Sequence, residues 1–282
     1  MIEPTVSTQT ASDGYALHLT RWPAEGQAKG RLVILHGVQS HGGWYHNLGR
    51  TLAGRGYDTT FPDRRGSGKN EADRGHARSS ERLLADIAEL LRSMRAADPS
   101  TPIALAGISW GGKLAVITAA RRPELVDALA LICPGLHPRV DVDRAERLRI
   151  ALAFFTNRRK RFPIPLADPA LFTDSPEGQA FIASDPLSLR TATAALLAAS
   201  RFIDRGVHKV RGKVRQPALL MLAGHDRIVD NRRTRGYFDG IGASRPRVIE
   251  YPDGHHTLEF DPDPSRYALD LAGWLDEALR PR

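Results

Sequence analysis

The most informative residues of this sequence are Gly107-Ile108-Ser109-Trp110-Gly111-Gly112. They follow the short apolar run 103–106, which indicates a buried strand, and they precede the helical stretch 113–121. A G-x-S-x-G sequence between a strand and a helix predicts a sharp turn that raises the serine hydroxyl above the end of a sheet. The helix that follows places Ser109 near backbone N–H groups that favour negative charge. We therefore predict that Ser109 is a nucleophile.

Other short apolar runs recur along the chain and predict further strands. Each run is too short for a helix and is bounded by Gly, Pro or Asp. Apolar residues recur at helical spacing over 83–94 and 267–278, so strands alternate with helices, which predicts a parallel sheet covered on both faces. Residues 5–8 and 15–20 flank Asp13-Gly14 and predict an antiparallel hairpin at the start of the sheet. The runs are 32–35, 129–132, 219–222 and 248–251.

The segment 136–214 interrupts this alternation. It contains several prolines, an alanine-rich helical piece at 191–200 and no convincing apolar strand. A structureless loop of this length is improbable in a compact domain, so we predict an inserted helical cap. The cap would cover the carboxyl edge of the sheet, where open α/β sheets bind ligands. The predicted organisation is a core of residues 1–135 and 215–282 with the cap at 136–214 between them.

A serine hydroxyl is a weak nucleophile until a base takes its proton, and two adjacent histidines follow the last predicted strand. These are His255 and His256, and the pattern of residues leaves both open as the base. The carboxylate that orients the imidazole is predicted to be Asp226, directly past the preceding strand. Asp230 better fits the cap of the next helix, and Asp253 fits a turn.

Acyl transfer also requires backbone donors for a negatively charged oxygen. The N–H of Trp110, directly after Ser109, is one candidate donor. The N–H of Val38 is the second, in the loop after strand 32–35, where Gly37 allows the backbone to turn. We expect His36 to have a structural hydrogen-bonding role.

Taken in order, these motifs resemble α/β-hydrolases of the monoacylglycerol lipase and lysophospholipase type over nearly the whole chain. The resemblance places the catalytic histidine on His256, and Ser, Asp, His is the order expected for this fold. Ser40 stands where that family often has Glu, and Asn70 where serine is common. The matching segments are His36-Gly37 with His41, Asp63-Arg64-Arg65-Gly66-Ser67-Gly68, 107–111, 224–229 and 251–258.

The resemblance implies an α/β-hydrolase fold, with a mostly parallel central sheet, helices on both faces and an inserted helical cap. It implies hydrolysis of monoacylglycerol-like, lysophospholipid-like or other small acyl esters through an acyl-enzyme on Ser109, without a cofactor or a metal. A thioesterase, aminopeptidase or lactonase would use the same triad, and a non-catalytic ligand-binding homologue is a further alternative. Cap residues that either line an acyl pocket or pack the cap are Phe154, Phe155, Phe162, Phe172, Phe181, Leu189, Leu196 and Leu197.

Length and composition exclude several other classes of protein. The 282 residues fit one α/β domain with an insertion, and 41% hydrophobic with 26% charged residues is a globular composition. No apolar run approaches the roughly 20 residues needed to cross a bilayer. The single cysteine, Cys133, excludes an intrachain disulfide, and the N-terminus lacks a signal pattern, so we expect a cytoplasmic protein.

The charge is basic, with 40 Lys and Arg against 32 Asp and Glu, a net charge of +8. The arginines are spread along the chain without a nucleic-acid-binding motif, so we expect no nucleic-acid partner. The densest run, Arg158-Arg159-Lys160-Arg161, lies in the predicted cap among Phe154, Phe155 and Phe162. Two interpretations remain open: a solvated loop or helix end, and peripheral contact with an anionic lipid surface.

Overall fold

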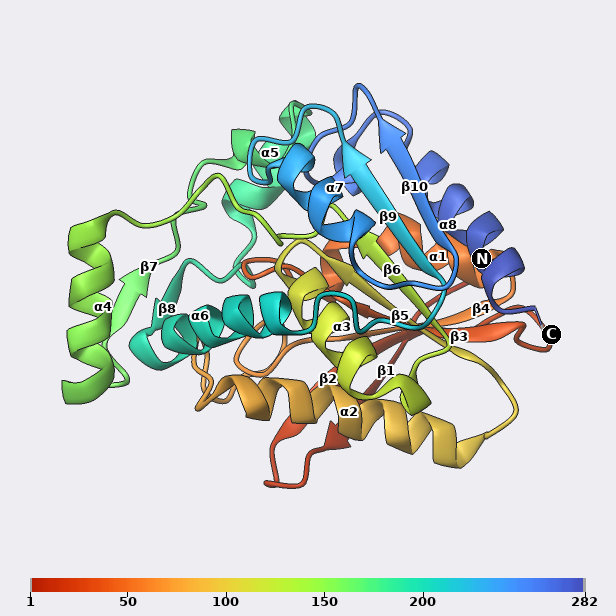
Figure 1. Cartoon of the computed structure of the whole chain (residues 1–282), viewed down its shortest axis with the longest axis horizontal. Helices are drawn as coiled ribbons and strands as arrows, with labels where there is room; N and C mark the ends of the chain where they lie inside the picture. Colours follow the sequence, from red (N-terminus) through yellow and green to blue (C-terminus); the bar gives the residue numbers. More distant parts are fainter. Residues whose placement is uncertain (1, 281–282) are drawn as a thin grey trace.

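The computed structural model describes residues 2–280, which form an eight-stranded central sheet (Figure 1). Its strands are β1 (Thr5–Thr10), β2 (Ala16–Trp22), β3 (Gly30–Leu35), β4 (Tyr57–Pro62), β5 (Ile103–Ile108), β6 (Ala128–Ile132), β9 (Ala218–Ala223) and β10 (Pro246–Tyr251). Their order in the sheet is β1-β2-β4-β3-β5-β6-β9-β10. β1 pairs antiparallel with β2, and β2 with β4, whereas all pairs from β4 to β10 are parallel. The predicted mostly parallel sheet is confirmed.

The parallel strands β3, β4, β5, β6 and β9 are buried along their whole length, as expected for a sheet with both faces covered. β4 is not among the strands predicted from the sequence, because Asp58, Thr59 and Thr60 interrupt its apolar pattern. Arg21 on β2 compensates the Asp58 carboxylate, with its Nε 2.7 Å from Asp58 Oδ1. A strand with a polar sequence is thus buried in the middle of the sheet.

Helices cover both faces of the sheet (Figure 1). α2 (Ser80–Ala97), α3 (Trp110–Arg121) and α6 (Ala194–Lys209) pack against one another, and α1 (His46–Gly54) packs against α8 (Pro264–Ala278). The helices expected around 83–94 and 267–278 are confirmed as α2 and α8. A further helix, α7 (Asn231–Asp239), lies between β9 and β10 in the sequence. Short 3₁₀ helices are η1 (Gly42–Trp44), η2 (Pro123–Leu125), η3 (Pro169–Leu171) and η4 (Leu258–Phe260).

The segment 136–214 connects β6 to β9. Besides η3 and α6 it contains α4 (Arg144–Thr156), β7 (Arg161–Pro163), α5 (Pro176–Ser184) and β8 (Thr191–Thr193). β7 and β8 form a small antiparallel sheet, which with α4 lies at the left of Figure 1, away from the central sheet. The start of the expected helical piece, Thr191–Thr193, is therefore a strand. Thr193 caps α6 by accepting a hydrogen bond from the Leu196 N–H.

α6 packs on α2 and α3 as well as on α4, so the last part of this segment lies beside the helices that cover the sheet. Its buried face includes Ile203 and Val207, which belong to the main hydrophobic core. Within residues 2–280, no helix combines the length and the apolar character that crossing a membrane requires.

Candidate active site

Ser109 lies at the turn between β5 and α3 and has a strained backbone. Its φ is +51° and its ψ is −123°, a region that residues other than glycine rarely adopt. Its N–H donates to the Ile132 carbonyl at 3.0 Å, and its carbonyl accepts from the N–H groups of Gly112 and Gly135 at 2.9 and 2.7 Å. Such strain persists only where the surrounding structure holds it, and it is concentrated at functional sites.

The glycines beside Ser109 allow the turn to pack directly on neighbouring backbone. A Cβ atom on Gly111 would lie 2.2 Å from the carbonyl oxygen of Leu35, and one on Gly107 would lie 2.6 Å from that of Gly111. These distances leave no room for a side chain. The turn therefore contacts the carboxyl end of β3 and brings Ser109 next to the loop that follows this strand.

Three side chains from the carboxyl ends of β5, β9 and β10 form a hydrogen-bonded chain. Nε2 of His256 is 2.9 Å from Oγ of Ser109, and Nδ1 of His256 is 2.8 Å from Oδ2 of Asp226. The other oxygen, Asp226 Oδ1, accepts from the N–H groups of Ile228 and Val229, each at 2.8 Å. The carboxylate oxygen of Asp226 accepts a hydrogen bond from Nδ1, and in this tautomer Nε2 of His256 faces the serine hydroxyl as an acceptor.

His255, the alternative base, faces away from Ser109. Its Nδ1 is 3.0 Å from Oδ1 of Asp261, and its Nε2 is 3.0 Å from Oδ2 of Asp174. Asp230, the alternative carboxylate, caps α7 by accepting from the Arg233 N–H at 3.0 Å, as predicted.

The loop with Gly37 and Val38 lies against Ser109. A Cβ atom on Gly37 would be 3.7 Å from Ser109 Oγ. Within residues 2–280, the backbone N–H groups of Val38 and Trp110 have no protein acceptor. The Gly37 N–H donates to Ser40 Oγ at 3.0 Å, and this hydroxyl is 3.1 Å from the Tyr45 hydroxyl. Ser40, which departs from the family pattern, thus holds the loop itself.

His36 is buried behind this loop and is neutral. Its Nε2 accepts from the Arg64 backbone N–H at 2.9 Å, so Nδ1 carries the proton and donates to the Gly37 carbonyl at 2.8 Å. Burial, assisted by the positive charge of Arg64, holds the pKa of His36 well below its ordinary value. His36 therefore has the structural hydrogen-bonding role expected from the sequence.

We expect the free energy of unfolding to fall as the pH drops below about 6.5, where His36 in the unfolded chain gains a proton. The folded chain keeps His36 neutral to lower pH, so this stability is present above that range and is lost on acidification. One histidine contributes at most about 1.4 kcal/mol per pH unit. Urea unfolding of the wild type and of His36→Asn at about pH 7.5 and about pH 5.5 measures this change in the free energy of unfolding. Equal pH dependence in both proteins would assign the effect to other groups.

Aromatic side chains form a wall of the cavity in front of Ser109. The ring of Phe172 lies 6.0 Å from that of His256 and 5.8 Å from that of Trp44, which also contacts Phe181 at 6.0 Å. Leu166 completes this part of the lining. Of the predicted pocket residues, Phe172 therefore lines the cavity, and Phe181 lies behind it against Trp44. The others lie elsewhere: Phe155 is exposed, Phe154 of α4 and Phe162 pack together with Ile150, and Leu189, Leu196 and Leu197 pack on buried core.

The segment 136–214 is tied to the loops that carry Asp226 and His256. Arg227 donates to Asp174 Oδ1 and to the Ala170 carbonyl, both at 2.6 Å, and the Thr257 N–H donates to the Phe172 carbonyl at 2.9 Å. No sequence pattern indicated these contacts. Within the described chain, no group of three or more His, Cys, Asp or Glu side chains is placed to hold a metal ion.

Comparison with known proteins identifies the family. The family described as Hydrolase_4, serine aminopeptidase S33, matches residues 26–263. The chain is 22% identical to a monoacylglycerol lipase of Mycolicibacterium smegmatis, with 90% of each chain covered, and 26% identical to a monoglyceride lipase of Homo sapiens, with 88% of this chain and 82% of that protein covered. The structure of a soluble variant of Saccharomyces cerevisiae monoglyceride lipase superposes with a TM-score of 0.87 at 18% identity, covering 100% of this chain and 97% of that one. The chain therefore belongs to the Hydrolase_4 family and is an α/β-hydrolase of the monoacylglycerol lipase type.

Proposed function

We propose that this protein is a serine hydrolase that cleaves carboxylic esters through an acyl-enzyme on Ser109. The observation that carries the proposal is the hydrogen-bonded chain from Ser109 through His256 to Asp226, at 2.9 and 2.8 Å. Nε2 of His256 accepts the hydroxyl proton as Ser109 Oγ attacks the ester carbonyl carbon. Asp226 holds the imidazole in the correct tautomer and stabilises the imidazolium that forms.

Attack converts the ester carbonyl into a tetrahedral intermediate with a negatively charged oxygen. The N–H groups of Val38 and Trp110 donate hydrogen bonds to this oxygen. His256 then returns its proton to the leaving alkoxide, the alcohol departs, and the acyl group stays on Ser109. The same imidazole then deprotonates a water molecule, which attacks the acyl carbon. The bond between this carbon and Ser109 Oγ breaks, His256 returns its proton to Oγ, and the carboxylic acid is released.

The proposed substrates are monoacylglycerol-like, lysophospholipid-like or other small acyl esters. Two kinds of observation support this class. Relatives with the names monoacylglycerol lipase and monoglyceride lipase match most of the chain. The cavity at Ser109 has apolar walls from Trp44, Leu166 and Phe172, which offer an acyl chain a surface away from water. Peptide hydrolysis is the alternative, because the family description is that of an aminopeptidase.

A substrate panel with a fluorophosphonate probe tests the proposal. The panel contains aryl esters of increasing acyl length, a monoacylglycerol, a lysophospholipid, an acyl thioester and an aminoacyl amide. The wild type should hydrolyse esters and carry the label on Ser109. Cleavage of the amide alone would replace the esterase with an aminopeptidase. A folded wild type that is neither labelled nor active would be a ligand-binding homologue.

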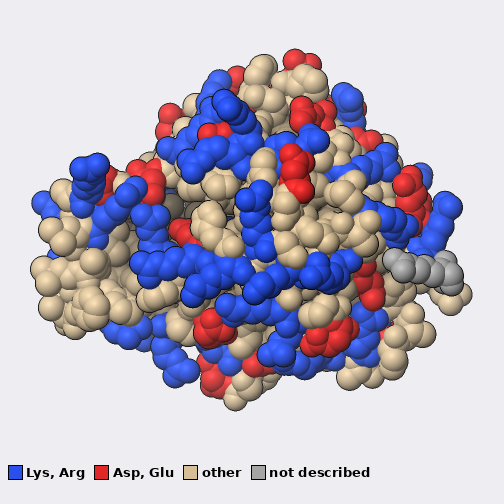
Figure 2. Space-filling view, in the orientation of Figure 1, with Lys and Arg blue, Asp and Glu red and all other residues tan. Residues whose placement is uncertain are grey.

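We also propose that α4 contacts a lipid surface. Leu148, Leu152 and Phe155 follow helical spacing on α4 and are 72%, 64% and 84% exposed. In Figure 2 the left end of the molecule, where Figure 1 places α4, is mostly uncharged and is flanked by Lys and Arg side chains. An exposed apolar face with basic neighbours matches the chemistry of an anionic membrane surface.

The basic run beside α4 is partly engaged within the protein. Arg158 stacks on the Phe154 ring at 4.4 Å and donates to the Arg78 carbonyl at 2.9 Å. Arg159 forms an ion pair with Asp73 at 3.0 Å. The apolar face should therefore contribute more to membrane contact than these charges do.

We expect the protein to cosediment with phosphatidylglycerol vesicles more than with phosphatidylcholine vesicles at low salt. Replacing Leu148, Leu152 and Phe155 with Ser should lower this binding several-fold, because the apolar contact with the acyl region is lost. Replacing the four residues of the basic run with Gln should have a smaller effect. The preference for anionic vesicles should weaken at about 0.1 M salt, where the Debye length is about 10 Å. Equal binding by the wild type and the Ser variant would contradict the proposal.

A further inference from the structure

We infer that Arg64 is a positioning residue for the oxyanion donors, an inference that rests on the proposed function. Arg64 follows β4, and its guanidinium holds two successive carbonyl groups of the loop beside Ser109. Nη1 donates to the Gly37 carbonyl and Nη2 donates to the Val38 carbonyl, each at 2.9 Å. A planar guanidinium can make both bonds at once, which the single ammonium of a lysine does less well.

Holding the Gly37 carbonyl also orients the Val38 N–H. The residues of this loop are joined by trans peptide bonds, in which the carbonyl and the next N–H lie on opposite sides of a rigid plane. The bond to Arg64 Nη1 therefore keeps the Val38 N–H pointing away from the guanidinium. Donation to the carbonyl also polarises the peptide and strengthens its N–H as a donor.

The orientation of the Gly37–Val38 peptide depends on hydrogen bonds from other side chains, because this peptide follows a glycine. Gly37 has no Cβ atom, so rotation of the Gly37–Val38 peptide meets little steric resistance. The Gly37 carbonyl accepts a second bond from Nδ1 of His36 at 2.8 Å. Two donors thus oppose a rotation that would present a carbonyl oxygen, instead of an N–H, to the substrate.

Arg64 also contacts the residue that carries the second donor. Its guanidinium carbon lies 4.8 Å from the centroid of the Trp110 ring, in a cation–π contact. The Trp110 ring is fixed at its other end, where Nε1 donates to Ser200 Oγ at 2.8 Å. One side chain therefore bridges the Val38 loop and the start of α3, on either side of Ser109.

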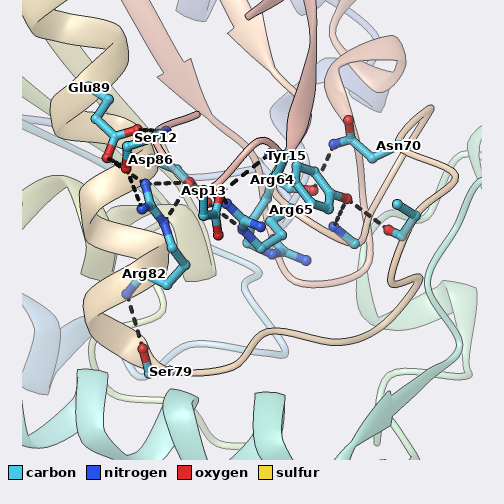
Figure 3. Close-up of polar contacts among 12 residues, drawn as sticks. Ser12, Asp13, Tyr15, Arg64, Arg65, Asn70, Ser79, Arg82, Asp86 and Glu89 are labelled. Atoms are coloured by element: carbon cyan, nitrogen blue, oxygen red, sulfur yellow. Dashed lines mark hydrogen bonds and ion pairs between the residues drawn. The ribbon is translucent and has the colours of Figure 1, made fainter. Parts of the chain in front are cut away.

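The backbone of Arg64 is itself firmly held, so the contacts of its side chain are pre-organised. Its carbonyl accepts from Ser67 Oγ at 2.7 Å and from Asn70 Nδ2 at 3.1 Å. The neighbouring Arg65 forms ion pairs with Asp86 and Asp13, in the polar network that Figure 3 shows between α2 and the hairpin turn. Burial lowers the pKa of Arg64 to about 10, which leaves it charged at neutral pH.

The test compares Arg64→Met and Arg64→Lys with the wild type on a water-soluble aryl ester. We expect kcat to fall about 10²-fold in Arg64→Met with little change in KM, because one misoriented oxyanion donor acts on the transition state. Arg64→Lys should retain more activity. The affinity for a trifluoromethyl ketone, whose adduct with Ser109 places an oxyanion in the same position, should fall together with kcat.

Arg245→Met is the matched control. Arg245 also donates to two successive backbone carbonyls, those of Glu277 and Ala278, but it lies directly before β10, at the opposite end of that strand from the His256 loop. The kcat of Arg245→Met on the same ester should equal that of the wild type. Added guanidinium ion should partly restore kcat in Arg64→Ala and should not affect Arg245→Ala.

Wild-type kcat and ketone affinity in Arg64→Met would overturn the inference and leave the proposed function intact. The inference would also be overturned if kcat of Arg64→Met fell only in proportion to the fraction of folded protein, measured by circular dichroism, and the folded fraction bound the ketone as the wild type does. A folded wild type without ester hydrolysis or labelling of Ser109 would overturn the proposed function and this inference together.

Discussion

Ser109→Ala is expected to abolish ester hydrolysis and to leave the fold intact. Loss of a triad nucleophile lowers kcat about 10⁶-fold in well-studied serine hydrolases, because no covalent intermediate can form. Initial rates on an aryl ester, with fluorophosphonate labelling of the same preparations, measure the effect. A purified, folded Ser109→Ala protein that keeps more than a few per cent of the wild-type rate would show that another residue is the nucleophile.

Ser109→Gly is a matched control at the same position. The φ of +51° is unfavourable for both Ser and Ala, whereas glycine adopts positive φ readily. Both variants should be inactive, but Ser109→Gly should be more stable than Ser109→Ala by about 1 kcal/mol, because it relieves backbone strain. Thermal unfolding of the two proteins measures this difference. Equal stability would show that the turn stores little strain.

The features that the sequence predicted well depend on local signals. The strand Ile103–Ile108, the glycine-rich turn and the helix from Trp110 follow one another within a short stretch, and each has its own residue pattern. The apolar runs 32–35, 129–132 and 219–222 predicted buried strands for the same reason, since the strands of a parallel sheet covered on both faces are mostly apolar along their length. The run 248–251 also gave a strand, β10, but most of its residues are exposed or half-buried.

The features that the sequence did not predict depend on partners far apart in the chain. β4 was missed because the residue that compensates its Asp58 is Arg21 on another strand. The strand Thr191–Thr193 was missed because its short sequence fits a helix start equally well and its partner is Arg161–Pro163.

In the candidate site, too, the contacts that were not predicted join residues far apart in the chain. The motif around Asp63 gave no indication that the Arg64 side chain reaches Gly37 and Val38, because this contact depends on the order of β3 and β4 in the sheet. The hydrogen bond from Arg227 to Asp174 also joins residues that are far apart in the chain: Arg227 lies in the loop after β9, and Asp174 lies in the segment 136–214. A local pattern identifies which residues have suitable chemistry, whereas the contacts that orient them depend on the tertiary fold.

His256→Ala is expected to be nearly as damaging as Ser109→Ala, and His255→Ala is expected to be much milder. Of the two histidines, His256 is the one that contacts both Ser109 and Asp226. Both ring nitrogens of His255 are occupied by Asp261 and Asp174, so its loss should affect the tie to the segment 136–214 rather than proton transfer. Initial rates of ester hydrolysis for the two variants measure this ranking, and the reverse order would move the base to His255.

The double variant Ser109→Ala/His256→Ala tests whether the two residues act in the same proton transfer. If the two residues act as one unit, the second substitution should lower kcat little beyond the first, because the base has no hydroxyl left to deprotonate. His255→Ala is the matched control, and its modest effect on the wild type should arise from the displaced loop. Losses for Ser109 and His256 that multiply in the double variant would mean that the two side chains act independently, and the proposed proton transfer from Ser109 Oγ to His256 Nε2 would then be wrong.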